Sequence, residues 1–126
     1  MRFKNTVFLW LPVIIWASFI FYLSSIPQLE LTSEPIGNFL TRKTGHIVEF
    51  AVLGSLILRA LKGKNYYLAI LLSVVYGIFD ETHQTFVPTR EFHFSDIGFD
   101  AAGVIIGIFS YAKRGARKER AGARHF

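Results

Sequence analysis

Long apolar segments without charge are the feature that most limits how this chain can fold. No charged residue lies between Lys4 and Glu30. Within that stretch, residues 7–23 are apolar except for Pro12 and Ser18. An α-helix needs about 20 such residues to cross the hydrocarbon core of a bilayer. We therefore predict that this segment is a first transmembrane helix.

A cleaved signal peptide is the alternative interpretation of this segment, because Arg2 and Lys4 precede the apolar run. The run is longer than the apolar core of a usual signal peptide, and no small-x-small cleavage site follows it. We expect the segment to remain as an uncleaved span.

Three further spans are predicted, so the expected fold class is an all-α membrane bundle of four transmembrane helices. The third span must continue through the polar run that starts at Asp80, because its uncharged part is too short to cross alone. Residues 28–42 are predicted to form a loop or a short surface helix. The three spans cover residues 44–61, 65–86 and 96–112.

Basic residues near the helix ends predict the orientation of the chain. They are concentrated at the N-terminus, between the second and third spans, and at the C-terminal end, where six of the 14 lie between Lys113 and Arg124. The positive-inside rule then places both termini in the cytoplasm. We divide the chain into a transmembrane domain, residues 1–112, and a basic cytoplasmic tail, residues 113–126, which can contact anionic lipid.

The composition excludes several classes of function. Hydrophobic residues make up 52% of the chain, which indicates the lipid bilayer as its environment. The absence of Cys excludes a disulfide framework, a thiolate zinc site and a cysteine nucleophile. No basic surface with interleaved aromatic residues is visible, so the sequence does not indicate nucleic-acid binding despite a net charge of +5.

Ionisable residues beside membrane-spanning sequence make residues 79–107 the place to look for function. Each Asp, Lys or Arg at the bilayer centre costs roughly 2.5–3.5 kcal/mol on an insertion scale, so such groups need partners or a function. At about 100° per residue, polar residues of the last three spans fall on shared helix faces. They are Asp80 and Gln84 on the third span, flanked by Glu81 and His83, and Asp96 and Asp100 on the fourth; Lys43, His46 and Glu49 on the second span spread across about a third of its circumference. We predict that they form an outward-facing, extracytoplasmic pocket.

Small residues lie below these polar positions. Gly103-x-x-x-Gly107 is typical of a close approach between membrane helices, and Gly77 offers a similar surface on the third span. We expect the third and fourth spans to pack closely there, which would bring the outer carboxylates together.

The predicted pocket is rich in carboxylates, which cannot all be ionised in a low dielectric without cations. A divalent cation is therefore the simplest cofactor, and Mg²⁺, Mn²⁺ or Ca²⁺ suits the oxygen-rich set, although a catalytic Zn²⁺ also fits. The predicted metal ligands are Asp80, His83, Asp96 and Asp100. The predicted catalytic residues are these four together with His46 and Glu49. The predicted substrate-binding residues are Lys43, Arg90, Gln84 and Glu81.

Lys43 and Arg90 suit an anionic group such as a lipid phosphate. If the chain is an enzyme, the residues favour a metal-assisted hydrolase or transferase that acts on a phosphate-containing envelope lipid. Other interpretations stay open. The polar residues could form a structural network in a non-catalytic accessory protein that binds a partner, and Glu81 could be solvated at the boundary. Ion or proton translocation is less favoured, because the carboxylates do not continue across the membrane.

Four motifs follow one another along the chain. They are Ser24-Ser25-Ile26-Pro27, residues 43–54 (KTGHIVEFAVLG), residues 80–90 (DETHQTFVPTR) and Asp96-x-x-x-Asp100-x-x-Gly103. Together and in this order they resemble the VanZ-like family of small bacterial membrane proteins. One departure is Thr89, where that family usually has Gly before the Arg.

The resemblance implies a multi-pass, four-span protein of the bacterial cell membrane. It also implies a link to low-level resistance to the glycopeptide antibiotic teicoplanin, which is known for the founding member, but it supplies no established reaction. We therefore expect the chain to bind or act on a cell-envelope component, such as a lipid-linked phosphate or a cell-wall precursor, and so to influence resistance of the teicoplanin type.

Overall fold

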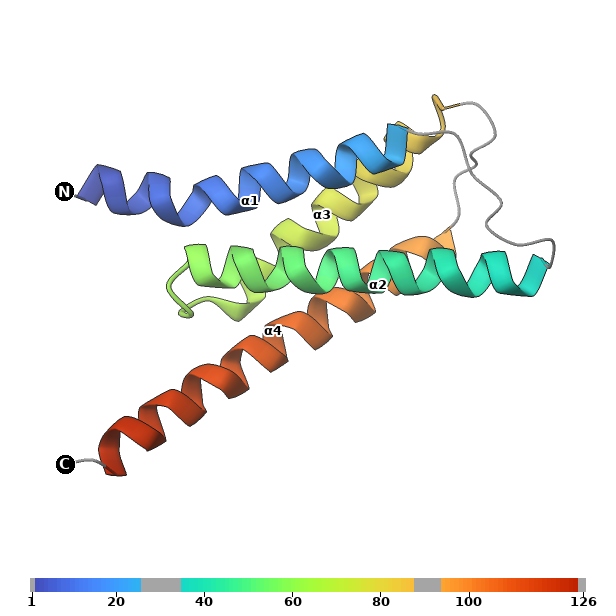
Figure 1. Ribbon diagram of the computed structural model, residues 1–126. Coiled ribbons are helices and arrows are strands. Elements are labelled where there is room, and N and C mark those ends of the chain that lie inside the picture. The colour runs from blue at the N-terminus through green and yellow to red at the C-terminus, as the bar shows by residue number, and fades with distance from the viewer. Residues whose placement is uncertain (1, 26–34, 88–93, 125–126) are drawn as a thin grey trace.

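The described part of the chain is built from α-helices and contains no strand (Figure 1). The computed structural model describes residues 2–25, 35–87 and 94–124. These residues form four helices, which confirms the predicted all-α class. The helices are α1 (Arg2–Ser25), α2 (Pro35–Ala60), α3 (Tyr66–Gln84) and α4 (Phe94–Arg124).

Helix α2 begins at Pro35, well before the predicted start at residue 44. Residues 28–42 were expected to be a loop or a short surface helix. Residues 35–42 are instead the first part of a continuous helix, and residues 28–34 lie outside the described part of the chain. Proline fits there because the first turn of a helix leaves its N–H groups without intrahelical partners. Hydropathy placed the boundary too late, because Asn38, Arg42 and Lys43 interrupt the apolar residues in the first turns of α2.

The turn between α2 and α3 is fixed by backbone hydrogen bonds. Lys62 has a positive φ of 61°, and Gly63 donates from its N–H to the carbonyl of Leu58 at 2.9 Å. This arrangement is a Schellman motif, which satisfies the last carbonyls of α2. Asn65 then caps α3, because its side-chain oxygen accepts a hydrogen bond from the N–H of Leu68 at 3.0 Å.

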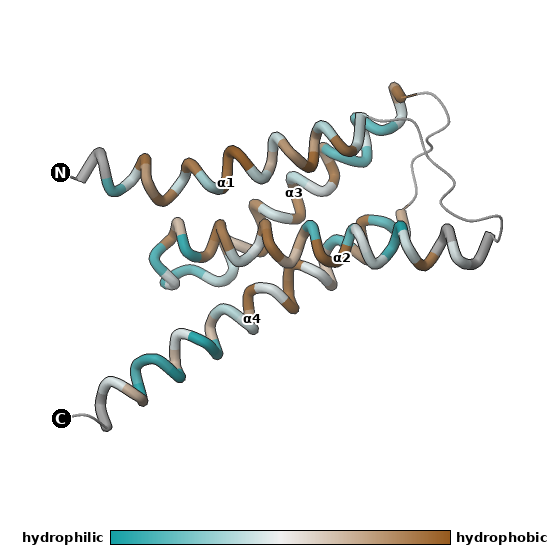
Figure 2. Tube along the Cα trace, viewed as in Figure 1, coloured by the Kyte–Doolittle hydropathy of each residue, from teal (hydrophilic) through white to brown (hydrophobic). Residues whose placement is uncertain are grey.

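Helix α4 continues through the basic C-terminal segment without a break. It contains 31 residues, and at about 1.5 Å per residue it is longer than a hydrocarbon core of about 30 Å. The predicted tail is thus helical up to Arg124. Figure 2 shows the change along this helix, from apolar residues beside α2 to hydrophilic residues towards its C-terminal end. The division into two domains at residue 112 stays a prediction.

The closest helix contact is between α2 and α4. Cβ atoms on Gly103 and Gly107 would collide with the carbonyl groups of Ile47 and Ala51 on α2. Ser55 closes the same contact, since its hydroxyl donates to the carbonyl of Gly107 at 2.9 Å. The two glycines therefore pack on α2 and not on α3 as the sequence had led us to expect.

Helix α1 lies against α2 and α3 and exposes its other side. Trp16 Nε1 donates to the carbonyl of Glu49 at 2.8 Å, and the Tyr76 hydroxyl donates to the carbonyl of Ala17 at 2.5 Å. Its outward residues are large and apolar, and Phe8 is 67% exposed. A surface of this kind suits contact with lipid.

Two of the described helices are long and apolar enough to cross a membrane. The segments are Asn5–Ser25, with a mean hydropathy of 2.1, and Phe94–Gly122, with a mean hydropathy of 1.3. Helices α2 and α3 carry most of the ionisable residues of the predicted pocket, and α4 carries Asp96 and Asp100. The four-span topology and the position of the termini remain predictions.

Candidate functional site

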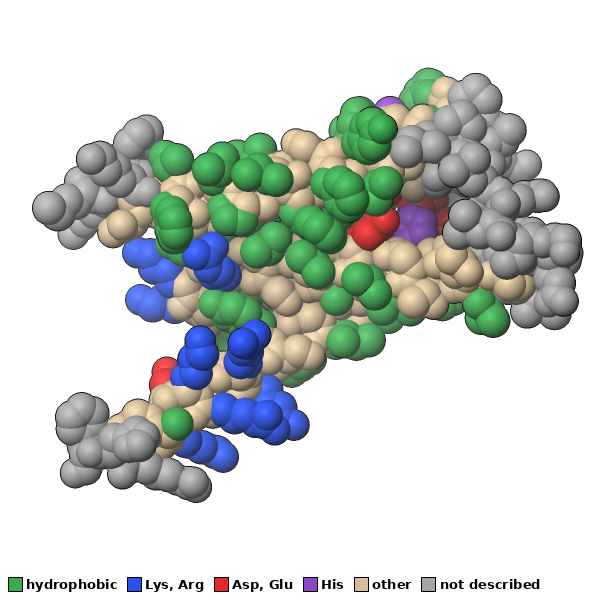
Figure 3. Space-filling view, viewed as in Figure 1, with side chains coloured by type: hydrophobic (Ala, Val, Ile, Leu, Met, Phe, Trp, Pro, Cys, Tyr) green, Lys and Arg blue, Asp and Glu red, His purple; other side chains and the backbone are tan. Residues whose placement is uncertain are grey.

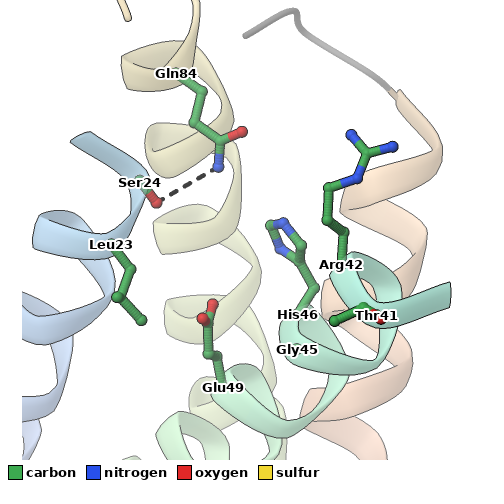
Figure 4. A pocket seen from close by; sticks show the side chains of 8 residues that line it. All are labelled: Leu23, Ser24, Thr41, Arg42, Gly45, His46, Glu49 and Gln84. Atoms are coloured by element: carbon green, nitrogen blue, oxygen red, sulfur yellow. Dashed lines mark hydrogen bonds between the residues drawn. The ribbon is translucent and has the colours of Figure 1, made fainter. Parts of the chain in front are cut away.

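A polar cavity lies where the end of α1, the first half of α2 and the end of α3 meet (Figure 4). Its volume is about 210 Å³. The side chains of His46, Glu49 and Gln84 point towards this common space. The cavity is lined by Leu23, Ser24, Thr41, Arg42, Gly45, His46, Glu49 and Gln84. This set of eight residues is called the cavity below.

One wall of the cavity joins α1 to α3 through a buried carboxylate. Asp80 is 0% exposed, and the Ser24 hydroxyl donates to its Oδ1 at 2.5 Å. Gln84 donates from Nε2 to Asp80 Oδ2 at 3.1 Å and to the Ser24 hydroxyl at 3.4 Å. Asp80 and Gln84 are four residues apart and share a helix face, as the sequence spacing predicted. The carboxylate is therefore held by donors from two helices.

The opposite wall joins α2 to α4. His46 Nδ1 lies 2.9 Å from Asp100 Oδ1, and Asp100 is 1% exposed. The other carboxylate oxygen, Oδ2, is buried and has no hydrogen-bond partner within the described residues. It faces α3, because a Cβ atom on Gly77 would come within 3.2 Å of it. Ligand atoms of His46, Glu81 and Asp100 lie within 4.8 Å of one another.

Glu81 is 0% exposed, so the interpretation that it is solvated at the boundary is wrong. It lies four residues after Gly77 on α3 and thus on the same face of that helix. The side chain takes part in the inner cluster with His46 and Asp100.

Lys43 forms a buried ion pair with Asp96. Its ammonium group also lies 5.2 Å from the centroid of the Phe99 ring. The pair closes the end of the α2–α4 contact, and Lys43 does not line the cavity. The basic residue that does line it is Arg42, which the sequence reasoning did not select.

His83 lies on the α1 side of α3. Its ring stacks on Phe21 with centroids 4.1 Å apart, and Nε2 is 3.0 Å from the Ser25 hydroxyl. The four predicted metal ligands are thus divided among different partners. Asp80 contacts Ser24 and Gln84, His83 contacts Ser25, Asp96 contacts Lys43, and Asp100 contacts His46.

The assignment of catalytic, substrate-binding and metal-binding roles stays a prediction. Arg90 lies outside the described residues. Ser24, Thr41 and Arg42 are cavity residues that sequence reasoning missed. For Ser24 the signal was present, since it belongs to the Ser24-Ser25-Ile26-Pro27 motif. For Thr41 and Arg42 the predicted loop before residue 44 concealed their place on a helix.

The cavity region opens sideways between two helices. Figure 3 shows acidic and histidine side chains in the space between α1 and α2, with hydrophobic side chains on both helices beside them. The same view shows Lys and Arg side chains gathered at the other end of the molecule, over the α2–α3 turn and the C-terminal part of α4. Both α1 and α4 also have their terminal ends there (Figure 1).

Donors and acceptors of hydrogen bonds occur together in the cavity. Arg42 supplies a permanent cation, Ser24 and Thr41 supply hydroxyl groups, and Glu49 supplies a carboxylate. Such a set suits a small polar group with anionic oxygens, because Arg can donate two parallel hydrogen bonds to a phosphate or carboxylate.

Comparison with protein families decides what kind of protein this is. The family model described as VanZ/LLP1 matches residues 8–114, which include most of all four helices. The chain belongs to the VanZ/LLP1 family. This confirms the resemblance inferred from the four motifs. No match was found among curated proteins or among solved structures.

Membership of the VanZ/LLP1 family and the two apolar helices together indicate a VanZ-like protein that associates with a membrane. The cavity and its buried carboxylates lie inside the matched region. They are therefore part of the family domain and not of an appended segment.

Proposed function

We propose that this VanZ-like protein binds the polar head of an amphiphilic cell-envelope component, such as a lipid-linked phosphate or a cell-wall precursor. The observation that carries the proposal is the polar cavity at one end of the bundle, with its side opening between α1 and α2 next to apolar surface. A head group could occupy such a cavity while its hydrocarbon chain stays among lipids.

The size of the cavity supports a head group and not a whole lipid. Pockets for drug-sized ligands are typically about 300–1,000 Å³, whereas this cavity has a volume of about 210 Å³. A phosphate or one sugar-sized group is the right scale. Because Arg42 lines the cavity, a phosphate is favoured over an uncharged sugar.

We further propose that all four helices cross a bacterial cell membrane and that the cavity faces the extracytoplasmic side. The distribution of charge supports this orientation, since Lys and Arg gather at the end opposite the cavity. An outward cavity would meet envelope precursors where they are used, which is consistent with an influence on teicoplanin-type resistance.

Binding of a long-chain polyprenyl phosphate to the purified protein in lipid nanodiscs tests the proposal. The same polyprenol without phosphate should bind much more weakly. Replacing Arg42 by Gln should weaken phosphate binding by about tenfold or more, because a charge-assisted hydrogen bond contributes about 1.5–3 kcal/mol. Arg59→Gln is the matched control, since Arg59 lies at the far end of α2 and its guanidinium contacts the Phe8 ring at 5.5 Å. Equal affinity of the two variants would contradict the proposed site.

A resistance assay tests the biological part of the proposal. Expression of the chain in a susceptible host should raise tolerance to teicoplanin, and Arg42→Gln should remove the gain while the protein still accumulates in the membrane. If the original protein and the Arg42→Gln variant raised teicoplanin tolerance equally, resistance would not depend on the cavity. Release of inorganic phosphate from the bound lipid, if chelator stops it and a divalent cation restores it, would show that binding leads to metal-assisted hydrolysis.

A structural or partner-binding role is the second proposal, and the hydrogen bonds between Ser24, Asp80 and Gln84 favour it. They tie α1 to α3 through a buried carboxylate whose two oxygens both accept hydrogen bonds, as a satisfied structural network requires. Under this proposal, Asp80→Asn lowers stability and resistance together. Under the first proposal, cavity variants that fold normally lose the phenotype.

A further inference from the structure

Three potential metal ligands from three helices converge behind the cavity. His46 comes from α2, Glu81 from α3 and Asp100 from α4, and one ligand atom of each lies within 4.8 Å of the others. Ligand atoms on opposite sides of an ion with bonds of 2.0–2.2 Å are about 4 Å apart. A small closure of this cluster would therefore place all three around one ion.

A second observation points to a ligand at this place. Asp100 Oδ2 is buried and has no hydrogen-bond partner among the residues described by the structure. Its position beside Gly77 directs it towards the α3 face that also carries Glu81. Hydrogen bonds usually satisfy a buried polar atom, and one that lacks them calls for an explanation such as an ion.

The neighbouring polar groups are already engaged with one another. Lys43 is paired with Asp96, and Asp80 accepts hydrogen bonds from Ser24 and Gln84. Two buried carboxylates, Glu81 and Asp100, lie beside one imidazole at this place. A divalent cation would neutralise both carboxylates in the low-dielectric interior.

We propose that His46, Glu81 and Asp100 bind a divalent cation. One imidazole nitrogen with two carboxylates suits Zn²⁺ or Mn²⁺. Asp100 Oδ1 contacts His46 Nδ1, which leaves Oδ2 for the ion. The site shares only Asp100 with the set predicted from the sequence, in which His83 and Asp96 now have other partners.

The ion would lie at the inner wall of the cavity, because His46 belongs to both the cluster and the cavity lining. Three protein ligands leave open coordination positions, so an anionic oxygen of the bound head group could occupy one of them. This last point rests on the proposed function of the cavity. Metal binding by the three residues does not.

Calorimetric titration of the chelator-treated, full-length protein in detergent with Zn²⁺ alone, and separately with Mn²⁺ alone, tests the proposal. We expect saturation at one ion per chain. Glu81→Gln and Asp100→Asn keep the shape of the side chain and remove a charged ligand, so each should weaken binding at least about tenfold. Glu119→Gln is the control, because it removes a carboxylate from the exposed C-terminal part of α4, away from the cluster, and should leave the affinity unchanged.

Circular dichroism and gel filtration check that each variant folds. If one of the buried variants fails to fold, His46→Gln replaces it, since that ring is only partly buried and lies at the cavity. No saturable binding to the original protein, or equal affinity in the folded cluster variants, would overturn the proposal. Polyprenyl phosphate binding by a protein that shows no saturable metal binding would overturn this inference alone and leave the proposed function standing. Polyprenyl phosphate binding that persists in chelator would overturn only the contact between the ion and the head group. Metal binding without lipid binding would sustain this inference and remove the proposed function.

Discussion

At the residue scale, the buried carboxylates are distinguished by their partners. Asp80 is held between a hydroxyl and an amide, Asp96 is paired with Lys43, and Asp100 contacts an imidazole. These are three chemically different environments within one end of the bundle. A substitution of the same kind at each should therefore have a different consequence.

Replacing Ser24 by Ala should lower stability. The change removes the donor to Asp80 Oδ1, and leaving a buried acceptor unsatisfied costs about 1–3 kcal/mol. Thermal unfolding in detergent, followed by circular dichroism, measures the loss. The control is Ser25→Ala, because the Ser25 hydroxyl is exposed, so that water can replace its contacts with the Phe21 carbonyl and with His83 Nε2. Equal losses would contradict the importance of the contact with Asp80.

The sequence predicts which polar residues face the interior of the bundle better than it predicts which residues they contact there. The spacing of Asp80 and Gln84 placed them correctly on one face. The pairing of His46 with Asp100 and of Lys43 with Asp96 depends on how α2 is rotated and shifted against α4, which no local pattern encodes. His83 lies only three residues from Asp80, yet this angular offset is enough to take its ring out of the cavity lining and stack it on Phe21, whereas Asp80 bonds to Ser24.

At the scale of the elements, the α2–α4 contact positions the site. The backbones approach so closely at Gly103 and Gly107 that α4 cannot carry a side chain there. His46 lies beside this contact on α2, and Asp100 lies one turn before it on α4. The hydrogen bond between His46 and Asp100 therefore depends on glycines that touch neither residue.

Gly107→Ala should destabilise the protein strongly. Its Cβ would collide with the backbone of Ala51, which cannot move aside as a flexible side chain could, so the helices must separate. Overpacking of this kind typically costs about 1–3 kcal/mol. Gly98→Ala is the control in the same helix, where nothing lies within 4 Å of the added atom. That variant should be neutral or stabilising by up to about 1 kcal/mol, because Ala favours helix. Thermal unfolding measures the stability of both variants. An equal loss of stability in Gly107→Ala and Gly98→Ala would contradict the packing argument.

Helix existence was predictable here, and helix ends were not. Apolar runs indicated all four helices, and the cap at Asn65 matches the expected start of the third. Asn38, Arg42 and Lys43 interrupt the apolar residues in the first turns of α2, and the last turns of α4 are polar. The apolar pattern therefore ends before the helix does at both places. Family motifs covered the site but carried no signal for the extension after residue 114.

At the scale of the whole molecule, the two ends of α3 lie at opposite ends of the bundle, which makes the membrane topology testable. The α2–α3 turn lies at the end of the bundle opposite the cavity, whereas α3 finishes beside the cavity. If α3 crosses the membrane, these two points lie on opposite sides of it. The chain contains no Cys, so a single introduced thiol reports its own position without background.

Lys64→Cys and Thr85→Cys place that thiol at exposed positions before and after α3. A maleimide that cannot cross the membrane should label Thr85→Cys in intact cells and Lys64→Cys only after lysis. The reverse pattern would invert the proposed orientation. Labelling of both in intact cells, or of neither, would mean that α3 does not cross.

The opening between α1 and α2 also decides in which phase a ligand would travel. A molecule that approaches from the side diffuses in two dimensions and is concentrated by its partition into the bilayer before it meets the protein. The affinity measured against total ligand would then fall as more lipid is added, although the contacts in the cavity are unchanged. Expressed as a mole fraction in the membrane, the same affinity should stay constant.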